Sequence, residues 1–390
     1  MVNPDIITDH VGRVSAWLDT LGDTRRAFAV VYHGDCDGVI SAALFDHILH
    51  LMPCRPTIRH VPVRTEQYDF EASLAQLENL LPDVTIFLDL SIQNHPEKLL
   101  RAAAATAGGI LVYDHHSQFT DRVPERTLYL NPSITPTGYD EESPPPCFFA
   151  ARLAQRRTGN DFDWAACIGL IAESAVEQFL PLFRKLPSQF PGLFPGNALD
   201  SARDVSASRL KEISYAIGSA FWAEPGAYEH RALRLLSEMI LAGSPRLFFD
   251  PANQEAREII ALERRVRSEI NRAYVEAEYN SYFAPEARLR YTEVQSEYRI
   301  GGVVATRLSR KHKDHIVVSG QHYAGRYVIE ARRGANCHGN VVDLLKEATR
   351  DLPVLSLGGH PAAAGAGLPE EVSAQFFLTL EQAARKYLPE

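Results

Sequence analysis

The sequence has few cysteines, no long apolar run and no excess of basic residues. Its five cysteines are scattered and form no C-x-x-C pair, so neither a disulfide framework nor a zinc–thiolate site is expected. No apolar run reaches the roughly 18 residues of a membrane-spanning helix. The first residues, MVNPDIITDH, lack the basic and then apolar pattern of a secretory signal, so we expect a cytoplasmic protein with no membrane partner.

The net charge of −9 limits the kinds of ligand that the protein binds through its surface. Proteins that coat long duplex nucleic acid usually carry a broad basic surface, which this composition disfavours. A polyanion would bind through a local basic patch or through metal ions. The chain has 390 residues, of which 45% are hydrophobic and 23% charged, and this predicts two or three globular domains.

Up to about residue 220 the sequence alternates between apolar strand-like runs and helical runs. Strands are expected at residues 27–32, 58–63, 84–88, 110–113 and 128–130, with helices at 39–51, 70–80 and 97–107 between them. This alternation is typical of a parallel α/β sheet with helices on both faces. Helical runs follow at 146–157 and 163–180, and the proline-rich residues 181–197 are expected to form a loop.

A long amphipathic helix separates this region from a second α/β pattern. Between residues 253 and 282, apolar residues recur at helical spacing among many Glu and Arg, which predicts a helix of about 45 Å. Further strands are expected at 289–294, 316–319 and 327–331, with helices at 303–311 and 341–350. The expected organisation is an N-terminal α/β domain (1–225), a helical connector (226–285) and a smaller C-terminal α/β domain (286–390).

Carboxylates and imidazoles follow three of the predicted strands. The segments are HGDCDG (33–38), FLDLS (87–91) and YDHH (113–116), and the side chains are His33, Asp35, Asp37, Asp89, Asp114, His115 and His116. Each could be a helix cap or a surface residue. The carboxyl ends of parallel strands, however, lie along one edge of a sheet, where ligands bind. Three such segments therefore predict one site.

This set of side chains suits two divalent cations. Carboxylates and imidazoles together bind Mn²⁺, Mg²⁺, Fe²⁺ or Zn²⁺, and without thiolate ligands Mn²⁺ is the preferred assignment, with Mg²⁺ as the alternative. Two such ions, about 3.5–4 Å apart, stabilise the attacking and leaving oxygens of a phosphoryl group. Cys36, between two aspartates, is interpreted as a spacer.

The three segments resemble motifs one to three of the DHH phosphoesterase superfamily. LGGHPAAAG (357–365) resembles the glycine–histidine signature of the DHH-associated domain. Within the superfamily, the sequence is most similar to RecJ-like single-strand exonucleases: LNPSI (130–134) and IGGVVATRL (300–308) resemble two of their segments, and the helix at 253–282 resembles their interdomain connector. The resemblance implies a DHH catalytic domain and a DHH-associated substrate-binding domain.

The resemblance also implies a ligand set. His33, Asp35 and Asp89 would bind one metal ion, and Asp37, Asp89 and His115 would bind the other, with Asp89 bridging the two.

Three further residues of the first domain receive roles from the resemblance. His116 would face the phosphate, and Asp114 would orient the histidines. The fourth motif of the superfamily normally ends in Asp, but the matching string, CIGLIAE, ends in Glu173, whose extra methylene moves the carboxylate by about 1.5 Å. We interpret Glu173 as a ligand; the alternative is that it binds no metal and the second ion is held weakly.

The C-terminal domain would supply the substrate contacts. Gly358 and Gly359 allow a phosphate to approach the backbone, and His360 can donate to a nonbridging oxygen. The segment EARRGANCH (330–338) resembles the phosphate-reading segment of this domain. Arg332 and its arginine neighbour point to opposite faces of a strand, and we assign the contact to Arg332; His338 is a substrate ligand or an ordinary loop histidine.

Three functions are compatible with this pattern. The first is a metal-dependent exonuclease that releases mononucleotides from single-stranded DNA or short oligonucleotides. The second is a phosphatase or phosphodiesterase for a small nucleotide such as 3′-phosphoadenosine 5′-phosphate or a cyclic dinucleotide, which the acidic composition favours. The third is a non-catalytic nucleotide-binding module, which the departure at Glu173 leaves open. The sequence indicates neither the cleavage polarity nor the oligomeric state.

Overall fold

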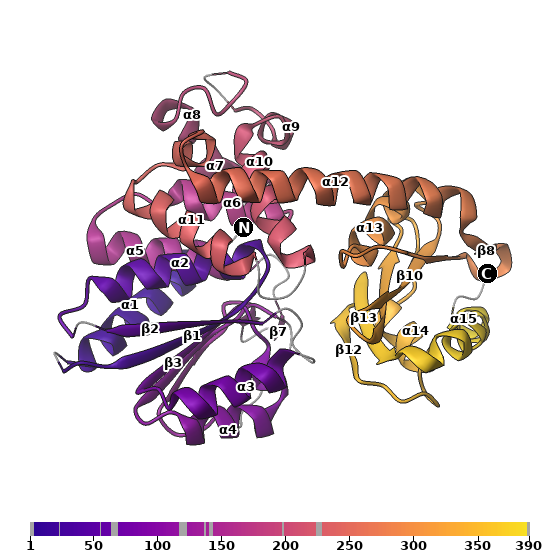
Figure 1. Cartoon of the computed structure of the whole chain (residues 1–390), viewed down its shortest axis with the longest axis horizontal. Coiled ribbons are helices and arrows are strands. Elements are labelled where there is room, and N and C mark those ends of the chain that lie inside the picture. Colours follow the sequence, from indigo (N-terminus) through magenta and orange to yellow (C-terminus); the bar gives the residue numbers. More distant parts are fainter. Residues whose placement is uncertain are drawn as a thin grey trace. The chain divides into compact units, whose positions relative to one another are not determined.

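The computed structural model describes residues 4–22, 24–54, 56–63, 69–116, 123–135, 138–139, 143–196, 199–223 and 228–387 (Figure 1). The chain forms two compact units. The first comprises Met1–Phe221 and Pro225–Glu263, and the second comprises Trp222–Glu224 and Arg264–Glu390. No helix in the described ranges is long and apolar enough to cross a membrane.

The first unit is built on a five-stranded parallel sheet in the order β2-β1-β3-β4-β5. Its strands are β1 (Ala27–His33), β2 (Thr57–Val63), β3 (Val84–Leu88), β4 (Gly109–Tyr113) and β5 (Thr127–Leu130). Every residue of β3 and β4 is buried, as expected for central strands that have helices on both faces. Two short strands, β6 (Ile134–Thr135) and β7 (Gly138–Tyr139), form a separate ribbon.

Helices cover both faces of this sheet. One face carries α3 (Asp69–Leu80) and α4 (Pro96–Ala105), whose residues Phe70, Leu77 and Leu99 share a core with β1–β4. The opposite face carries α1, α2, α5 and α6, seen above the sheet in Figure 1. The remaining bounds are α1 (Pro4–Thr20), α2 (Cys36–His50), α5 (Pro146–Thr158), α6 (Asp163–Ala172), α9 (Ala202–Ser206), α10 (Arg209–Trp222) and α11 (Glu229–Leu241).

The prediction of a loop at residues 181–197 is partly wrong. It contains two single-turn helices, α7 (Leu180–Phe183) and α8 (Leu186–Gln189). Both have a proline in their first turn, where the missing N–H costs no helical hydrogen bond. Their apolar side chains Leu182, Phe183 and Leu186 are buried, so tertiary packing stabilises turns that have no helical periodicity of their own.

The second unit contains a six-stranded mixed sheet in the order β12-β13-β11-β10-β9-β8. Its strands are β8 (Tyr282–Ala284), β9 (Leu289–Glu293), β10 (Ile316–Tyr323), β11 (Arg326–Arg333), β12 (Ser356–His360) and β13 (Ala363–Pro369). Only β9 and β10 run parallel; the other neighbours are antiparallel. The expected α/β fold, with a parallel sheet followed by a second α/β unit, is confirmed.

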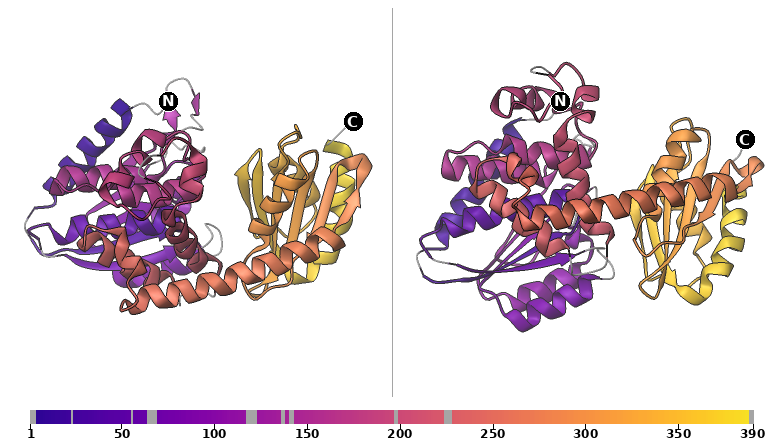
Figure 2. Two further views of the ribbon diagram at one scale, coloured as in Figure 1. Left: turned by 90° about the horizontal axis from the view of Figure 1, so that it is seen from above. Right: turned by 45° about the horizontal axis from the view of Figure 1, so that its top comes forward.

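Helices flank this second sheet as well (Figure 2). They are α13 (Gly301–Lys311), α14 (Val341–Ala348) and α15 (Ser373–Tyr387). The core on the α14 and α15 side includes Tyr327, Ile329 and Phe376. The long helix α12 (Gln254–Asn280) has 27 residues, or about 40 Å, and begins in the first unit and ends in the second.

Candidate metal centre

The turn HGDCDG joins β1 to α2 and places three candidate ligands. His33 is the last residue of β1, and Asp35 is the N-cap of α2, where its Oδ1 accepts a hydrogen bond of 3.0 Å from the amide of Gly38. A side chain at Gly38 would overlap the carbonyl oxygen of His33, so only glycine fits this sharp turn. The cap and the glycine together hold both carboxylates of the turn beside the strand end.

Asp89 lies at the centre of the site, directly after β3. Its Oδ2 is 3.5 Å from Nδ1 of His33, and its Oδ1 is 3.4 Å from Nε2 of His115. Its backbone is left-handed, with φ of 58°, a conformation that Asp tolerates better than most residues. Burial would raise the pKa of Asp89, but hydrogen bonds to His115 and His33 lower that pKa well below its usual range. Asp89 is therefore an ionised carboxylate between two histidines.

Two groups of ligand atoms share Asp89. His33, Asp35 and Asp89 form one group, and Asp89, His115 and His116 form the other, with the ligand atoms of each group within 4.8 Å of one another. His33 Nδ1 also lies 3.0 Å from Asp35 Oδ2. Burial disfavours the charged form of His33, yet Asp35 raises the pKa of His33 well above its usual value. The geometry thus gives two groups of side chains that could each hold a cation, with a carboxylate in common.

Asp37 is the strongest sign that the chain alone does not complete this site. The residue is fully buried; its Oδ1 accepts a hydrogen bond of 2.8 Å from the amide of Cys147, but Oδ2 has no hydrogen-bond partner in the described part of the chain. Burial, followed by repulsion from Asp89 and Glu173, raises the pKa of Asp37 well above its usual range. A buried carboxylate oxygen without a donor is costly, and a divalent cation would satisfy it.

Glu173 lies at the C-cap of α6, and its residue as a whole is exposed. Dehydration of its carboxylate beside the site, followed by repulsion from Asp35, raises the pKa of Glu173 to about 7. The charges of His115, Asp89 and His116 also act on this carboxylate. Glu173 therefore lies close to the other candidate ligands, although it is not in either group of three.

His116 and Asp114 form a pair behind the site. Nδ1 of His116 lies 2.6 Å from Oδ1 of Asp114, which is fully buried, and Oδ2 of Asp114 accepts a hydrogen bond of 2.5 Å from Nε2 of Gln93. His116 also belongs, with Asp89 and His115, to one of the two groups of candidate ligands. Burial opposes ionisation of Asp114, but His116 lowers the pKa of Asp114 below its usual value.

Three positioning residues could not be assigned from the sequence. Besides Gln93, Asn131 donates to the carbonyl of His116 at 2.9 Å, and Ser133 donates to the carbonyl of His115 at 2.5 Å. Asn131 and Ser133 are also joined by a hydrogen bond of 2.9 Å. Their segment, LNPSI, was recognisable as a motif, but its contact with the backbone of the two histidines depends on the pairing of β4 with β5.

The predicted substrate contacts lie in the second unit, around β11, β12 and β13. In the sheet register, Arg332 pairs with Ala363, which in turn pairs with His360. Gly358 and Gly359 precede His360 in β12, and Gly359 has φ of 134°. Arg332, the glycines and the backbone of His360 are thus neighbours, whereas the side chain of His360 lies outside the described residues.

Arg332 is already engaged within its own unit. It donates to Glu330 at 3.1 Å, to Thr306 at 3.1 Å and to the carbonyl of Ala364 at 3.3 Å. His338 follows β11 in an exposed loop and has no hydrogen-bond or ion-pair partner among the described residues. Arg332 is held in one orientation, while the orientation of His338 is not fixed by such contacts.

No protein-family model and no curated protein sequence matches the chain. Solved structures do match. RecJ of Thermus thermophilus in complex with Mn²⁺ superposes with a TM-score of 0.67 at 18% identity, over 99% of this chain and 56% of that one, so the chain spans little more than half of that RecJ. A manganese-bound exonuclease RecJ gives 0.66 at 20% identity, over 97% and 94% of the two chains. The fold is that of RecJ-like DHH proteins.

A further solved structure, the DHH domain of PF0399, matches with a TM-score of 0.68 at 15% identity, over 98% of this chain and 91% of that one. The resemblance found in the sequence is thus confirmed at the level of the fold.

Proposed function

We propose that the protein is a phosphoesterase that requires two divalent metal ions. The observation that carries this proposal is the sharing of Asp89 between two groups of ligand atoms. The buried Oδ2 of Asp37, which has no donor among the described residues, supports it independently. Both RecJ structures described above contain manganese, and a third, of Thermus thermophilus RecJ, contains Mg²⁺. The mixture of carboxylate and imidazole ligands, without a thiolate, makes Mn²⁺ the preferred ion.

In this proposal, side chains of the first unit bind the two metal ions. His33, Asp35 and Asp89 hold one ion. Asp89 and His115, from the second group of ligand atoms, hold the other ion together with Asp37, which is not in that group but has a buried Oδ2 without a hydrogen-bond partner among the described residues. Bound ions would supply an activated water and would neutralise charge on a phosphoryl group.

The residues around these ligands have separate roles in the proposal. Glu173 adds a carboxylate to the second ion. His116, oriented by Asp114, donates a hydrogen bond to a phosphate oxygen, and Asn131 and Ser133 fix the backbone of both histidines.

The proposed substrate is single-stranded nucleic acid or a short oligonucleotide, from whose end mononucleotides are released. Support comes from the match to an exonuclease RecJ over nearly the whole of both chains, which includes both units. In the second unit, Arg332, His338, His360 and the glycines Gly358 and Gly359 are proposed to contact the phosphate. The side-chain donors would replace water molecules that hydrate the phosphate, and the glycines would let the phosphate approach the backbone closely.

A small-nucleotide phosphodiesterase is the second candidate. The net charge of −9 favours a short substrate over a long polyanion. The fold also matches an exopolyphosphatase-related protein from Bacteroides fragilis with a TM-score of 0.51 at 14% identity.

The test is a product time course with metal-stripped protein to which Mn²⁺ or Mg²⁺ is added back. The substrates are end-labelled single-stranded DNA, a trinucleotide, a cyclic dinucleotide and 3′-phosphoadenosine 5′-phosphate. Successive release of mononucleotides from the long strand is the expected result. Hydrolysis of only the small substrates would select the second candidate, and no hydrolysis with either metal would contradict both.

A further inference from the structure

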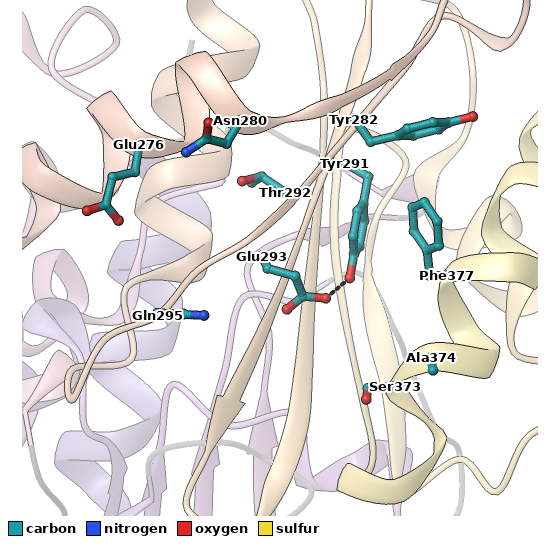
Figure 3. A pocket seen from close by; sticks show the side chains of 10 residues that line it. All are labelled: Glu276, Asn280, Tyr282, Tyr291, Thr292, Glu293, Gln295, Ser373, Ala374 and Phe377. Atoms are coloured by element: carbon teal, nitrogen blue, oxygen red, sulfur yellow. Dashed lines mark hydrogen bonds between the residues drawn. The ribbon is translucent and has the colours of Figure 1, made fainter.

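A cavity of about 650 Å³ lies in the second unit (Figure 3). It is on the opposite face of the sheet from Arg332. Its wall includes Tyr291 of β9 and Phe377 of α15, whereas Arg332 faces Thr306 of α13. The cavity exists because β8 is short. It pairs with β9 only from Leu289 to Tyr291, so the next residues of β9 have no β8 residue beside them. This volume is in the range of ordinary small-molecule sites.

Three aromatic rings form one side of the cavity. The centroids of Tyr291 and Phe377 are 4.8 Å apart, and those of Tyr282 and Phe377 are 5.3 Å apart at 82°. Tyr282 is 39% exposed and Phe377 is half-buried, so these two rings are accessible to a ligand, whereas Tyr291 is buried behind them. The faces of aromatic rings attract cations.

A carboxylate lies beside these rings. Glu293 Oε1 accepts hydrogen bonds from the hydroxyls of Tyr291 and Tyr327, and Figure 3 shows Tyr291 between Glu293 and Phe377. A side chain at Gly320 would overlap the hydroxyl of Tyr327, so the glycine makes room for this arrangement. The carboxylate is thus held in place by two neutral donors.

The charge of Glu293 is not balanced within the described part of the second unit. Glu293 is exposed and has no ion-pair partner there. The other acid of the cavity, Glu276, lies 2.6 Å from Arg272, which also donates to the carbonyl of Gln295 at 2.6 Å. The residues that line the cavity include no Lys or Arg. Arg272 also lies 2.6 Å from Glu269, so it does not balance Glu276 alone, and the cavity presents excess negative charge that repels anions.

We propose that this cavity binds an organic ammonium ion, with the ammonium group on Glu293 and its alkyl chain on Phe377. A guanidinium group fits less well, because its fork takes two carboxylate oxygens and Oε1 of Glu293 already accepts two hydroxyls. A bare divalent ion would find one carboxylate in place of the several oxygen ligands that it needs. The same chemistry occurs in a free diamine and in a lysine side chain of a partner.

The experiment is calorimetric titration of the full chain at about 150 mM salt, which screens non-specific attraction to an acidic protein. The probes are putrescine, the amide of Nα-acetyl-lysine and uncharged 1-butanol. Saturable binding of putrescine or the lysine amide, at least tenfold tighter than binding of 1-butanol, is expected. Tighter binding of putrescine indicates a free amine as the natural ligand; tighter binding of the lysine amide indicates a lysine side chain. No saturable binding of either amine up to about 10 mM would overturn the proposal.

Matched variants locate the binding. Glu293→Gln retains an oxygen that accepts from both tyrosines but removes the charge, and it should weaken amine binding at least tenfold. Phe377→Leu should weaken it about threefold, because less apolar surface is left for the alkyl chain. Asp351→Asn removes one charge from an exposed turn outside the cavity and should leave the affinity unchanged. Equal affinities of Glu293→Gln and the wild type, with unchanged thermal unfolding, would overturn the proposal.

Discussion

Two clusters of charged side chains, one in each unit, differ in how their acidic groups are balanced. In the first unit, Asp35, Asp89 and Asp114 have only histidines as ion-pair partners among the described residues. In the second unit, Glu330 lies between two permanent cations, 3.4 Å from Arg299 and 3.1 Å from Arg332. The first cluster therefore carries excess negative charge, whereas the second is balanced by its own chain.

This difference indicates which cluster requires a ligand and which is already organised. Buried like charges raise one another's pKa values, as Asp89 does for Asp37, and a bound cation would remove that repulsion. An arginine held by a carboxylate, a hydroxyl and a carbonyl needs no ligand to fix its orientation. The first cluster could hold metal ions, and in the proposed function the second supplies a preorganised contact to a phosphate.

The difference between the two clusters is tested most strongly by the variant Asp89→Asn. Asparagine keeps the size of the side chain and tolerates the left-handed backbone, but it removes the charge shared by both groups. We expect hydrolysis to fall about 10³-fold or more, which corresponds to about 4 kcal/mol in the barrier, with a lower content of bound metal. Steady-state rates and metal analysis measure both effects.

Asp46→Asn is the matched control. Asp46 lies on α2 in the same unit and also has two histidine neighbours, His60 at 3.1 Å and His50 at 3.3 Å. Its substitution should leave hydrolysis and metal content unchanged. If Asp89→Asn kept more than about a tenth of the activity, the shared-carboxylate assignment would be wrong.

The second prediction concerns the turn that positions the first cluster. Gly38→Ala places a methyl group against the carbonyl of His33, so β1 or α2 must shift, and the stability should fall by about 3 kcal/mol. Gly12→Ala, within α1, meets nothing within 4 Å and should stabilise the protein by about 0.5–1 kcal/mol. Thermal unfolding of both variants distinguishes them. Equal melting temperatures would show that the turn tolerates a side chain.

Much of the first unit was predictable because its signals are local. Continuous buried runs marked the central strands, and the rule for strand ends correctly brought His33, Asp89 and His115 together. Helix α1 was not predicted, although Val14 and Leu18 recur at helical spacing on its buried face. The signal for this helix is therefore present in the sequence.

Other features depend on tertiary contacts that no local pattern contains. The short helix α7 is stabilised by burial of Leu182 and Phe183. The link from Ser133 to His115 and the meeting of Tyr327 with Glu293 each require a particular sheet register. The sequence shows that such residues are present but not which strands become neighbours.

The third prediction tests the balanced cluster. If Arg332 contacts the phosphate, Arg332→Gln should raise KM for a trinucleotide about tenfold while kcat and metal content change little, since the metal ligands lie in the other unit. Arg333→Gln, whose parent residue donates to the carbonyl of Gly339 at 3.2 Å, should have a smaller effect. A larger effect from Arg333→Gln would reverse the assignment. Equal melting temperatures of the two variants would exclude a difference in folding as the cause.

The variant with the smallest expected effect, Glu173→Gln, tests whether Glu173 adds to the excess negative charge of the first cluster. The pKa of Glu173 is raised to about 7 in the folded protein, above its ordinary value near 4.5. Between these two values the folded state binds more protons than the unfolded state, so the carboxylate makes the metal-free protein less stable as the pH rises through this window. Glu173→Gln has no such proton to lose. In EDTA its melting temperature should therefore exceed that of the wild type at pH 8 but not at pH 4, by no more than about 2 °C, because the residue is exposed and solvent screens its charge.

Mn²⁺ should reverse this order at pH 8 if Glu173 is a metal ligand, because the ion stabilises the folded wild type more than the variant. Glu177→Gln, at an exposed position four residues later with no ion-pair partner among the described residues, is the control and should follow the wild type under both conditions. A melting difference that is the same at every pH and in the presence of Mn²⁺ would place Glu173 outside the cluster. In that case the excess negative charge of the first unit would come from its three strand-end segments alone, and the substitution of Asp by Glu in the fourth motif would have no consequence for metal binding.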